Sequence, residues 1–219
     1  MSNKLRYYQI KDKCYPSVTT VLSAKPNYAL EKWKEKLGEE KAREEAERSA
    51  KRGTNVHKMI EIHLLGGRVL ADVMWSAGVS ANDYELFKQI KKNVNQIQNV
   101  RAIEDFLYSD KIKLAGTVDC VGSLEGKISV IDFKTSNKMK QKPIENHLIQ
   151  CTAYSLMYEE IYHVKVDQIA LMYTCEDGTT QNFYADPDDY KEKLTDLVKY
   201  FVDNEKRLID ERSVEIIKK

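Results

Sequence analysis

The chain has 219 residues, of which 42% are apolar, so it can bury one hydrophobic core with at most a small appended lobe. Lys and Arg number 35 against 34 for Asp and Glu, and this net charge of +1 rules out a basic field over the whole molecule, so any attraction for phosphate must be local. No window approaches a membrane span, and the first residues lack the features of a signal or transit peptide, so we expect a soluble protein with no membrane partner.

The first part of the chain, residues 1–99, is predicted to be mainly helical. A short strand or hairpin is expected over residues 5–16. Residues 28–51 are rich in Glu, Lys, Arg and Ala at i,i+4 spacing, which predicts a solvated helix that Gly38 divides. Further helices are expected over 18–22 with Ser17 as its cap, over 53–65 with Gly66-Gly67 at its end, and over 81–98 after a loop.

The second part, residues 100–219, is predicted to hold a sheet and a closing helix. Apolar-rich runs predict strands over 100–109, 113–121 and 127–134, and a hairpin over 168–174 and 181–185 around Asp177-Gly178. Helices are expected over 143–162 and from Asp186-Pro187 to about 208. This order favours a mixed α/β core, a central sheet flanked by helices.

Two of the predicted strands carry the residues that most strongly suggest a metal-binding or catalytic site. A hairpin of the strands that contain Asp119 and Asp132-Phe133-Lys134 would bring both aspartates to one end of the sheet. Because side chains alternate along a strand, Asp132 and Lys134 share one face while Phe133 points to the other. Paired carboxylates bind a divalent ion, and a nearby lysine stabilises phosphoryl charge, although charged residues at strand ends are commonly only solvated.

Several other polar residues stand near these strands in the predicted order. His57 and Glu61 lie one helical turn apart, and a neutral imidazole there could complete a metal shell, although a lone helical histidine is more often a surface or packing residue. Gln150 and Tyr154 also lie one turn apart, where they could contact a nucleic acid or brace the carboxylates. The loop lysines Lys138, Lys140 and Lys142 could follow a phosphate backbone or be simply exposed.

Taken together, these residues resemble the ordered motifs of RecB-type nucleases in the PD-(D/E)XK superfamily. The resemblance covers roughly residues 15–160, and the opening Tyr15-Pro16-Ser17-Val18-Thr19-Thr20-Val21-Leu22 is similar to a compact branch of exonucleases with mitochondrial, phage and bacterial members. The matching segments are Arg52-Gly53-Thr54-Asn55-Val56-His57, Glu104, Gly116-Thr117-Val118-Asp119, Ile131-Asp132-Phe133-Lys134-Thr135-Ser136 and Gln150-Cys151-Thr152-Ala153-Tyr154.

The resemblance implies a restriction-endonuclease-like fold, one nuclease domain over residues 1–219, and roles for particular residues. It implies that His57, Asp119, Asp132 and the backbone carbonyl of Phe133 are metal ligands, that Lys134 is the catalytic lysine, and that Asp119 and Asp132 act with it. Supporting or DNA-binding roles are expected for Glu104, Gln150, Tyr154, Lys138 and Lys140, with Glu104 placed behind the metal ligands. The metal expected is Mg²⁺, for which Mn²⁺ could substitute.

Cysteine usage and the N-terminus bear on what else the resemblance implies. Cys14, Cys120, Cys151 and Cys175 are widely scattered without a CxxC pair, so no iron–sulfur cluster is expected, and reduced thiols fit a cytoplasmic protein of a bacterium or a phage-infected cell. The N-terminus has no targeting segment like that of the mitochondrial members.

The function implied is a metal-dependent exonuclease that hydrolyses DNA and prefers single-stranded ends. The charged N-terminal helices could form an arch for one strand, with Trp33 available for base stacking. Two other classes stay open: a module of the same fold that binds DNA ends without cutting, and a scaffold protein that uses the charged helix over 31–52 as its partner surface.

Overall fold

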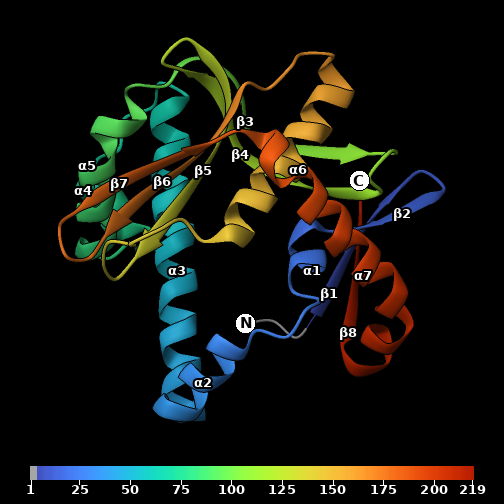
Figure 1. Cartoon of the computed structure of the whole chain (residues 1–219). Helices are drawn as coiled ribbons and strands as arrows, with labels where there is room; N and C mark the ends of the chain where they lie inside the picture. Colours follow the sequence, from blue (N-terminus) through green and yellow to red (C-terminus); the bar gives the residue numbers. More distant parts are fainter. Residues whose placement is uncertain (1–3) are drawn as a thin grey trace.

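The computed structural model describes residues 4–219, and its centre is a five-stranded sheet (Figure 1). The strand order is β3-β4-β5-β6-β7, in which only the β5–β6 pair is parallel. The strands are β3 (Gln98–Ser109), β4 (Leu114–Leu124), β5 (Lys127–Ser136), β6 (Gln168–Cys175) and β7 (Thr180–Ala185). The expected mixed sheet flanked by helices is therefore confirmed.

Helix α6 (Glu145–Tyr162) lies over one face of this sheet, and α7 (Lys191–Glu211) packs against α6. Parallel strands need a crossover connection, and α6 supplies it between β5 and β6. The helix is buried along most of its length because it packs between the sheet and its neighbours α1 (Val18–Leu22) and α7. The core on this side joins Val118 and Val130 of the sheet to Ile149 and Met157 of α6 and to Phe201 of α7.

The opposite face is covered by α3 (Glu39–Leu64) and α5 (Ala81–Val94). Met59 and Ile60 of α3 and Ile90 of α5 are buried in one cluster with Ile131 and Phe133 of β5. Alternation along β5 explains the two cores, since Ile131 and Phe133 face α3 while Val130 faces α6. The face of the sheet that Asp132 and Lys134 were predicted to share is thus the α6 face.

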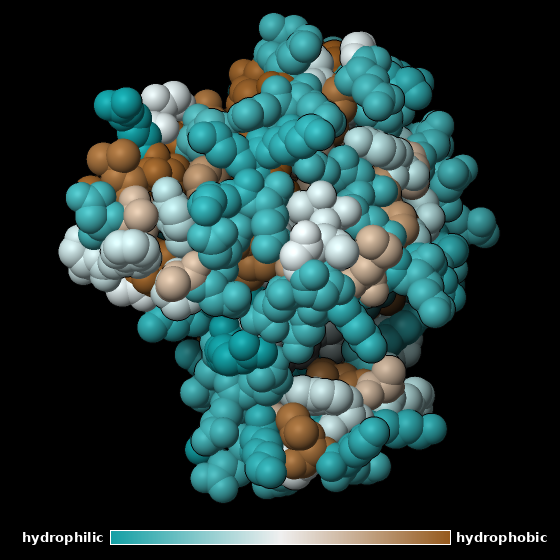
Figure 2. All heavy atoms as spheres, turned by 90° about the vertical axis from the view of Figure 1, so that its left-hand side faces the viewer, coloured by the Kyte–Doolittle hydropathy of each residue, from teal (hydrophilic) through white to brown (hydrophobic). Residues whose placement is uncertain are grey.

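The beginning of α3 and the preceding α2 (Tyr28–Leu37) form an arm that projects from this body (Figure 1). No residue of α2 is buried. In the space-filling view the arm is the lowest part of the molecule, below a recess, and the surface facing the viewer is mostly hydrophilic (Figure 2). The arm therefore owes little of its order to core packing, and i,i+3 or i,i+4 pairs such as Arg48 with Glu45 hold its helix.

A second, three-stranded sheet joins the two ends of the chain. β1 (Lys4–Ile10) pairs with β2 (Lys13–Pro16) as the expected hairpin and with β8 (Ser213–Lys218) in parallel. Ser17 caps α1 as expected, since its Oγ accepts from the N–H of Thr20 at 3.0 Å. No helix of the described chain combines the length and the apolar character needed to cross a membrane.

Four sequence predictions of secondary structure were wrong in detail. The helix expected to start at Gly53 is the continuation of α3, because Arg52 and Gly53 pack against the end of β5 and hold the helix through the glycine. Helix α4 (Ala71–Ser76) lies within the expected loop, α5 ends at Val94 rather than 98, and β8 was not predicted. β8 consists of six residues that are stabilised by pairing with β1, a contact between the chain ends that periodicity does not reveal.

Candidate active site

Three carboxylates lie level with one another on the adjacent strands β3, β4 and β5. The register that pairs Ile103 with Cys120 and Asp105 with Val118 places Glu104 opposite Asp119. The register that pairs Cys120 with Ile131 would, one step further, place Asp119 opposite Asp132. The predicted hairpin is therefore confirmed, and it extends to a third strand that carries Glu104.

The regular sheet pairing is interrupted at this level. Glu104 has φ +46°, a left-handed conformation that is uncommon outside glycine and that typically costs about 1–3 kcal/mol. β4 and β5 part beyond Cys120 and Ile131, and the Oδ2 of Asp119 accepts from the N–H of Phe133 at 2.9 Å in place of a ladder bond. The parted strands leave room for side chains and for the Phe133 carbonyl to face α3.

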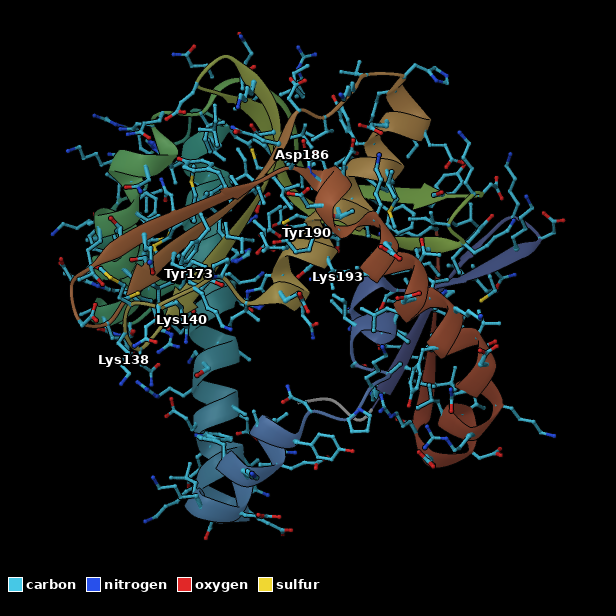
Figure 3. The ribbon with its side chains drawn as sticks, viewed as in Figure 1. Lys138, Lys140, Tyr173, Asp186, Tyr190 and Lys193 are labelled. Atoms are coloured by element: carbon cyan, nitrogen blue, oxygen red, sulfur yellow. The ribbon has the colours of Figure 1, made fainter. Side chains whose placement is uncertain are left out.

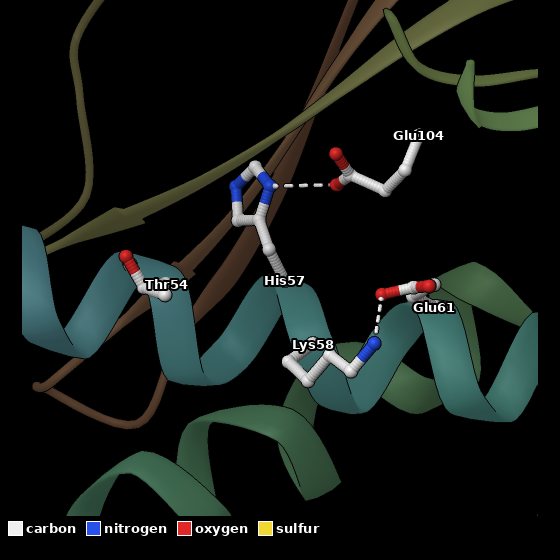
Figure 4. Close-up of a pocket in the computed structure, with 6 residues that line it drawn as sticks. Thr54, His57, Lys58, Glu61 and Glu104 are labelled. Atoms are coloured by element: carbon white, nitrogen blue, oxygen red, sulfur yellow. Dashed lines mark hydrogen bonds and ion pairs between the residues drawn. The ribbon is translucent and has the colours of Figure 1, made fainter. Parts of the chain in front are cut away.

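His57 of α3 enters this opening. Its Nε2 lies 2.7 Å from the carbonyl oxygen of Phe133, and its Nδ1 lies 3.5 Å from Asp119 Oδ2. The same Nδ1 lies 3.8 Å from Glu104 Oε1, a pair that Figure 4 shows. His57, Glu104 and Asp119 each offer one ligand atom, and these atoms all lie within 4.8 Å of one another. Glu104 was expected behind the ligands, and the structure places its carboxylate among them.

The charge on His57 is set by these neighbours. Burial disfavours the charged imidazole, but the carboxylates of Asp119 and Glu104 outweigh it and raise the pKa of His57 to about 9. At neutral pH His57 is therefore protonated and offsets two negative charges. A metal ion needs a neutral imidazole, so it would displace this proton.

Asp132 and Lys134 form a buried ion pair beside the cluster. Lys134 Nζ lies 2.5 Å from Asp132 Oδ1, and Asp132 is 2% exposed. Burial raises the pKa of Asp132, and the nearby Lys134 opposes this shift. Burial lowers the pKa of Lys134, but the carboxylates of Asp132 and Asp119 outweigh burial, so the net pKa is raised and the ammonium keeps its proton.

The second carboxylate oxygen of Asp132 lacks any partner. Oδ2 is buried and has no hydrogen bond to any atom of residues 4–219. An orphaned buried carboxylate oxygen is costly, and it calls for a ligand that the polypeptide does not supply. Hard oxygen ligands suit a divalent cation, and the His57, Glu104 and Asp119 group, with the Phe133 carbonyl beside it and Asp132 on the same strand as Phe133, offers residues that fit a metal centre.

Gln150 and Tyr154 of α6 close the site from the other side. Tyr154 is buried against β4, and a Cβ added to Gly116 would lie 2.9 Å from its hydroxyl oxygen, so the glycine is required by this close approach. Burial raises the pKa of Tyr154, while a hydrogen bond from Gln150 opposes the shift. Tyr154 thus packs against the strand that carries Asp119, and Gln150 contacts Tyr154.

A cavity of about 390 Å³ opens along α3 next to His57. It is lined by Gly53, Thr54, His57, Lys58, Glu61 and Glu104 (Figure 4). Its volume falls in the range of small-molecule sites. The cavity makes the cluster accessible from the side of α3.

Lys138 and Lys140 lie outside the cluster, in the loop after β5. Lys138 is exposed and Lys140 is half-buried, and in Figure 3 Lys140 lies between Lys138 and Tyr173. The backbone of Lys140 is fixed by Gln181, which accepts from its N–H at 3.0 Å and donates to its carbonyl at 2.8 Å. The structure therefore places these lysines beside the site rather than in it.

Arg52 is a site residue to which sequence reasoning gave no role. It is 5% exposed, lies 2.7 Å from Glu176 Oε1, and donates to Thr135 Oγ1 at 3.3 Å and to Asn137 Oδ1 at 3.1 Å. It thereby ties α3 to the end of β5 and to the turn after β6. The only sequence signal was an arginine directly before Gly53 in the helix that carries His57.

The mixed sheet gathers three carboxylates, a histidine and a lysine where two strands part, which suits a divalent metal and a phosphoryl group. Residues 17–216 match the profile of the PD-(D/E)XK nuclease superfamily, and the chain belongs to that superfamily. The expected family and the enzyme class of nuclease are therefore confirmed.

Curated relatives point in the same direction. The chain is 27% identical over 176 residues to mitochondrial genome maintenance exonuclease 1 of Mus musculus and 28% identical over 182 residues to that of Homo sapiens. These matches include 75% of this chain and 51% and 50% of the two relatives, so the chain spans about half their length.

A solved structure shares the fold. A candidate exonuclease from Eubacterium rectale superimposes with a TM-score of 0.51 at 11% identity, over 73% of this chain and 67% of the other. At that identity the likeness concerns the fold alone.

Proposed function

We propose that the protein is a metal-dependent DNA exonuclease that hydrolyses phosphodiester bonds and prefers single-stranded ends. The observation that carries the proposal is the unpartnered oxygen of Asp132, a buried carboxylate whose other oxygen pairs with the Lys134 ammonium and whose strand neighbours the one that carries Asp119 of the His57, Glu104 and Asp119 group. A binding module or a scaffold has no need of a buried carboxylate held in this state.

The metal would be held by Asp119, Asp132, Glu104, His57 and the carbonyl of Phe133. When bound, a divalent ion such as Mg²⁺ or Mn²⁺ supplies Lewis acidity and lowers the pKa of water. His57 would have to give up its ring proton to act as a ligand, so metal binding would weaken as the pH falls.

Lys134 has two tasks that follow from its position. Its ammonium is fixed by Asp132 and keeps its charge at neutral pH. It can therefore orient a water for attack and offset the negative charge that grows on the phosphoryl oxygens in the transition state. Because Asp132 holds the lysine before substrate arrives, little reorganisation is needed during the reaction.

The choice of DNA rests on the relatives, whose names assign them to the maintenance of a mitochondrial genome. The preference for single strands rests on the arm. Tyr28 and Trp33 of α2 are 71% and 36% exposed, and aromatic stacking contributes about 1–3 kcal/mol per base. An arm beside the body favours a strand that enters by its end.

The test is Lys134→Ala, assayed on end-labelled single-stranded DNA with Mg²⁺ and with chelator. Loss of one charge-stabilising group in the site lowers kcat by roughly 10²–10³-fold. Lys127→Ala is the matched control, since Lys127 is an exposed lysine at the other end of β5. Full activity of Lys134→Ala, or activity in chelator, would contradict the proposal.

Two further results would separate the other classes. Binding of DNA ends with no cleavage in any divalent metal would favour the binding module, and absence of any DNA affinity would favour the scaffold. Cleavage of circular single-stranded DNA would remove the preference for ends.

A further inference from the structure

A pair of polar side chains beside Lys134 has no part in the reaction described so far. His147, in the first turn of α6, lies with its Nδ1 2.8 Å from the hydroxyl of Tyr173 on β6. Tyr173 is the register partner of Lys134 across the parallel β5–β6 pair, so the two side chains stand next to each other on one face of the sheet.

Hydrogen bonding leaves one nitrogen of His147 available. Burial and the nearby Asp132 raise the pKa of Tyr173 to about 12, so its hydroxyl keeps its proton and can donate it to Nδ1. Burial and the cations Lys134 and Lys140, against the opposing Asp132, lower the pKa of His147 to about 4, so the ring is neutral. We assign the ring proton to Nε2, which has no hydrogen-bond partner among the residues described.

Charge near this nitrogen favours an anion. Lys140 makes no ion pair with any residue from 4 to 219, and its backbone is clamped on both sides by Gln181. The nearest acidic residue of the same helix turn, Glu145, is engaged by Lys193. A lysine side chain on an anchored backbone and a free N–H donor, both near Lys134, are groups that recognise a phosphate.

We infer that His147, Tyr173 and Lys140 form a subsite for the phosphate that neighbours the scissile phosphodiester, an inference that rests on the proposed function. Asp119 on β4 and Glu104 on β3 lie to one side of β5, and Tyr173 on β6 lies to the other, because β4, β5 and β6 are successive strands spaced by about 4.8 Å. His147 and Lys140 bind the second phosphate, and Tyr173 positions His147. A ligand that contacts both sides has at least two phosphates, as a polynucleotide does and a phosphomonoester does not.

The first experiment measures the binding of a labelled single-stranded oligonucleotide in chelator at several salt concentrations. Lys140→Ala is expected to reduce the slope of log K against log salt by about 0.7, the value for one phosphate contact on a single strand. His147→Ala is expected to weaken binding roughly tenfold without changing the slope, since the lost donor is neutral. Tyr173→Phe should reproduce part of the His147 effect, His147→Gln should restore part of the affinity, and the control Lys127→Ala should change neither quantity.

The second experiment locates the contact on the substrate. Oligonucleotides that carry one neutral methylphosphonate, placed in turn at each of the linkages nearest either end, are cleaved by the wild type, Lys140→Ala and Lys127→Ala. A methylphosphonate at the linkage next to the cleaved bond should raise KM for the wild type and for Lys127→Ala. The same substitution should have little effect on KM for Lys140→Ala, which already lacks the contact. Equal sensitivity of all three proteins at every linkage, with cleavage intact, overturns the subsite and leaves the proposed function standing. A wild type that neither binds nor cleaves DNA overturns both.

Discussion

The two oxygens of the Asp132 carboxylate have different surroundings. One oxygen holds the Lys134 ammonium, and the other is buried without a partner in the described chain. Retaining such a group lowers stability unless a ligand completes it. The residue therefore exchanges some stability of the free protein for a prepared binding site, and the exchange can be measured.

Binding of Mn²⁺ should stabilise the wild type in thermal unfolding. At a metal concentration about 100-fold above Kd the gain is about 2.7 kcal/mol, which corresponds to a rise in Tm of roughly 5–10 °C for a chain of this size. Asp132→Asn should lose most of this rise, whereas Asp196→Asn, an exposed change on α7, should keep it. An undiminished rise in Asp132→Asn would show that the ion binds elsewhere.

His147 gives a prediction for stability against pH. Its folded pKa of about 4 lies below the ordinary value of 6.5, so the unfolded chain takes up a proton that the folded chain refuses as the pH falls from 6.5 to 4. This residue therefore makes the protein less stable with falling pH over that window, by on the order of 3 kcal/mol at most.

The groups that act on the ring are Lys134 and Asp132 of β5, Lys140 of the loop and Tyr173 of β6. Chemical denaturation of His147→Gln should show a smaller loss of stability between pH 6.5 and pH 4 than the wild type shows. Identical pH profiles would mean that the imidazole is not held in its neutral form.

The two halves of helix α3 have different surroundings. Its second half packs on the sheet and delivers His57, while its first half extends into the exposed arm. Arg52 lies at the junction, where one buried guanidinium contacts Glu176, Thr135 and Asn137. The position of His57 relative to β5 therefore depends on this arginine as well as on apolar packing.

Arg52→Ala should lower the free energy of unfolding by about 2–3 kcal/mol, because it leaves a partly buried carboxylate without its closest partner. Arg48→Ala is the matched control: Arg48 contacts the same Glu176 but is 52% exposed, so its loss should cost less than about 1 kcal/mol. Arg52→Lys should not restore the wild-type free energy of unfolding, since an ammonium cannot make the three contacts that the planar guanidinium makes. Equal effects of the two alanine variants would contradict the role given to Arg52.

At the scale of the molecule, the candidate active site lies in the body around the five-stranded sheet, and the arm of α2 and the start of α3 projects from that body. The body is tied together by the sheet that joins both ends of the chain, while α2 contributes no buried residue. A change on α2 can therefore alter the binding of a strand without altering stability. This separation allows the arm to be tested alone.

Trp33→Ala should weaken binding of single-stranded DNA by roughly 5–150-fold, the equivalent of about 1–3 kcal/mol of stacking. The Tm should stay within about 1 °C of the wild type, since the residue belongs to no core cluster. Leu37→Ala, at the end of the same helix and equally exposed, removes apolar surface without an aromatic ring and should change affinity little. Unchanged affinity in Trp33→Ala would exclude the arm from the path of the strand.

Much of the fold and part of the site could be predicted from local patterns. Alternation in β4 and β5 and the turn between them bring Asp119 level with Asp132, because a hairpin of neighbouring strands has few possible registers. The side of the sheet shared by Asp132 and Lys134 follows from the same period of two. Helix caps such as Ser17 are also local, since their hydrogen bonds join residues three apart.

The remaining features depend on contacts between distant segments. Glu104 meets His57 only because β3 pairs with β4 and α3 crosses the same edge, and its left-handed backbone has no sequence signature. The contacts of Arg52 with Glu176 and of His147 with Tyr173 likewise join residues far apart in the chain. The sequence by itself determined the strands of the central sheet and the carboxylates they carry, since those depend on neighbouring residues. Tertiary packing alone decided which side chains complete the site, because their positions depend on how whole elements dock around two buried cores.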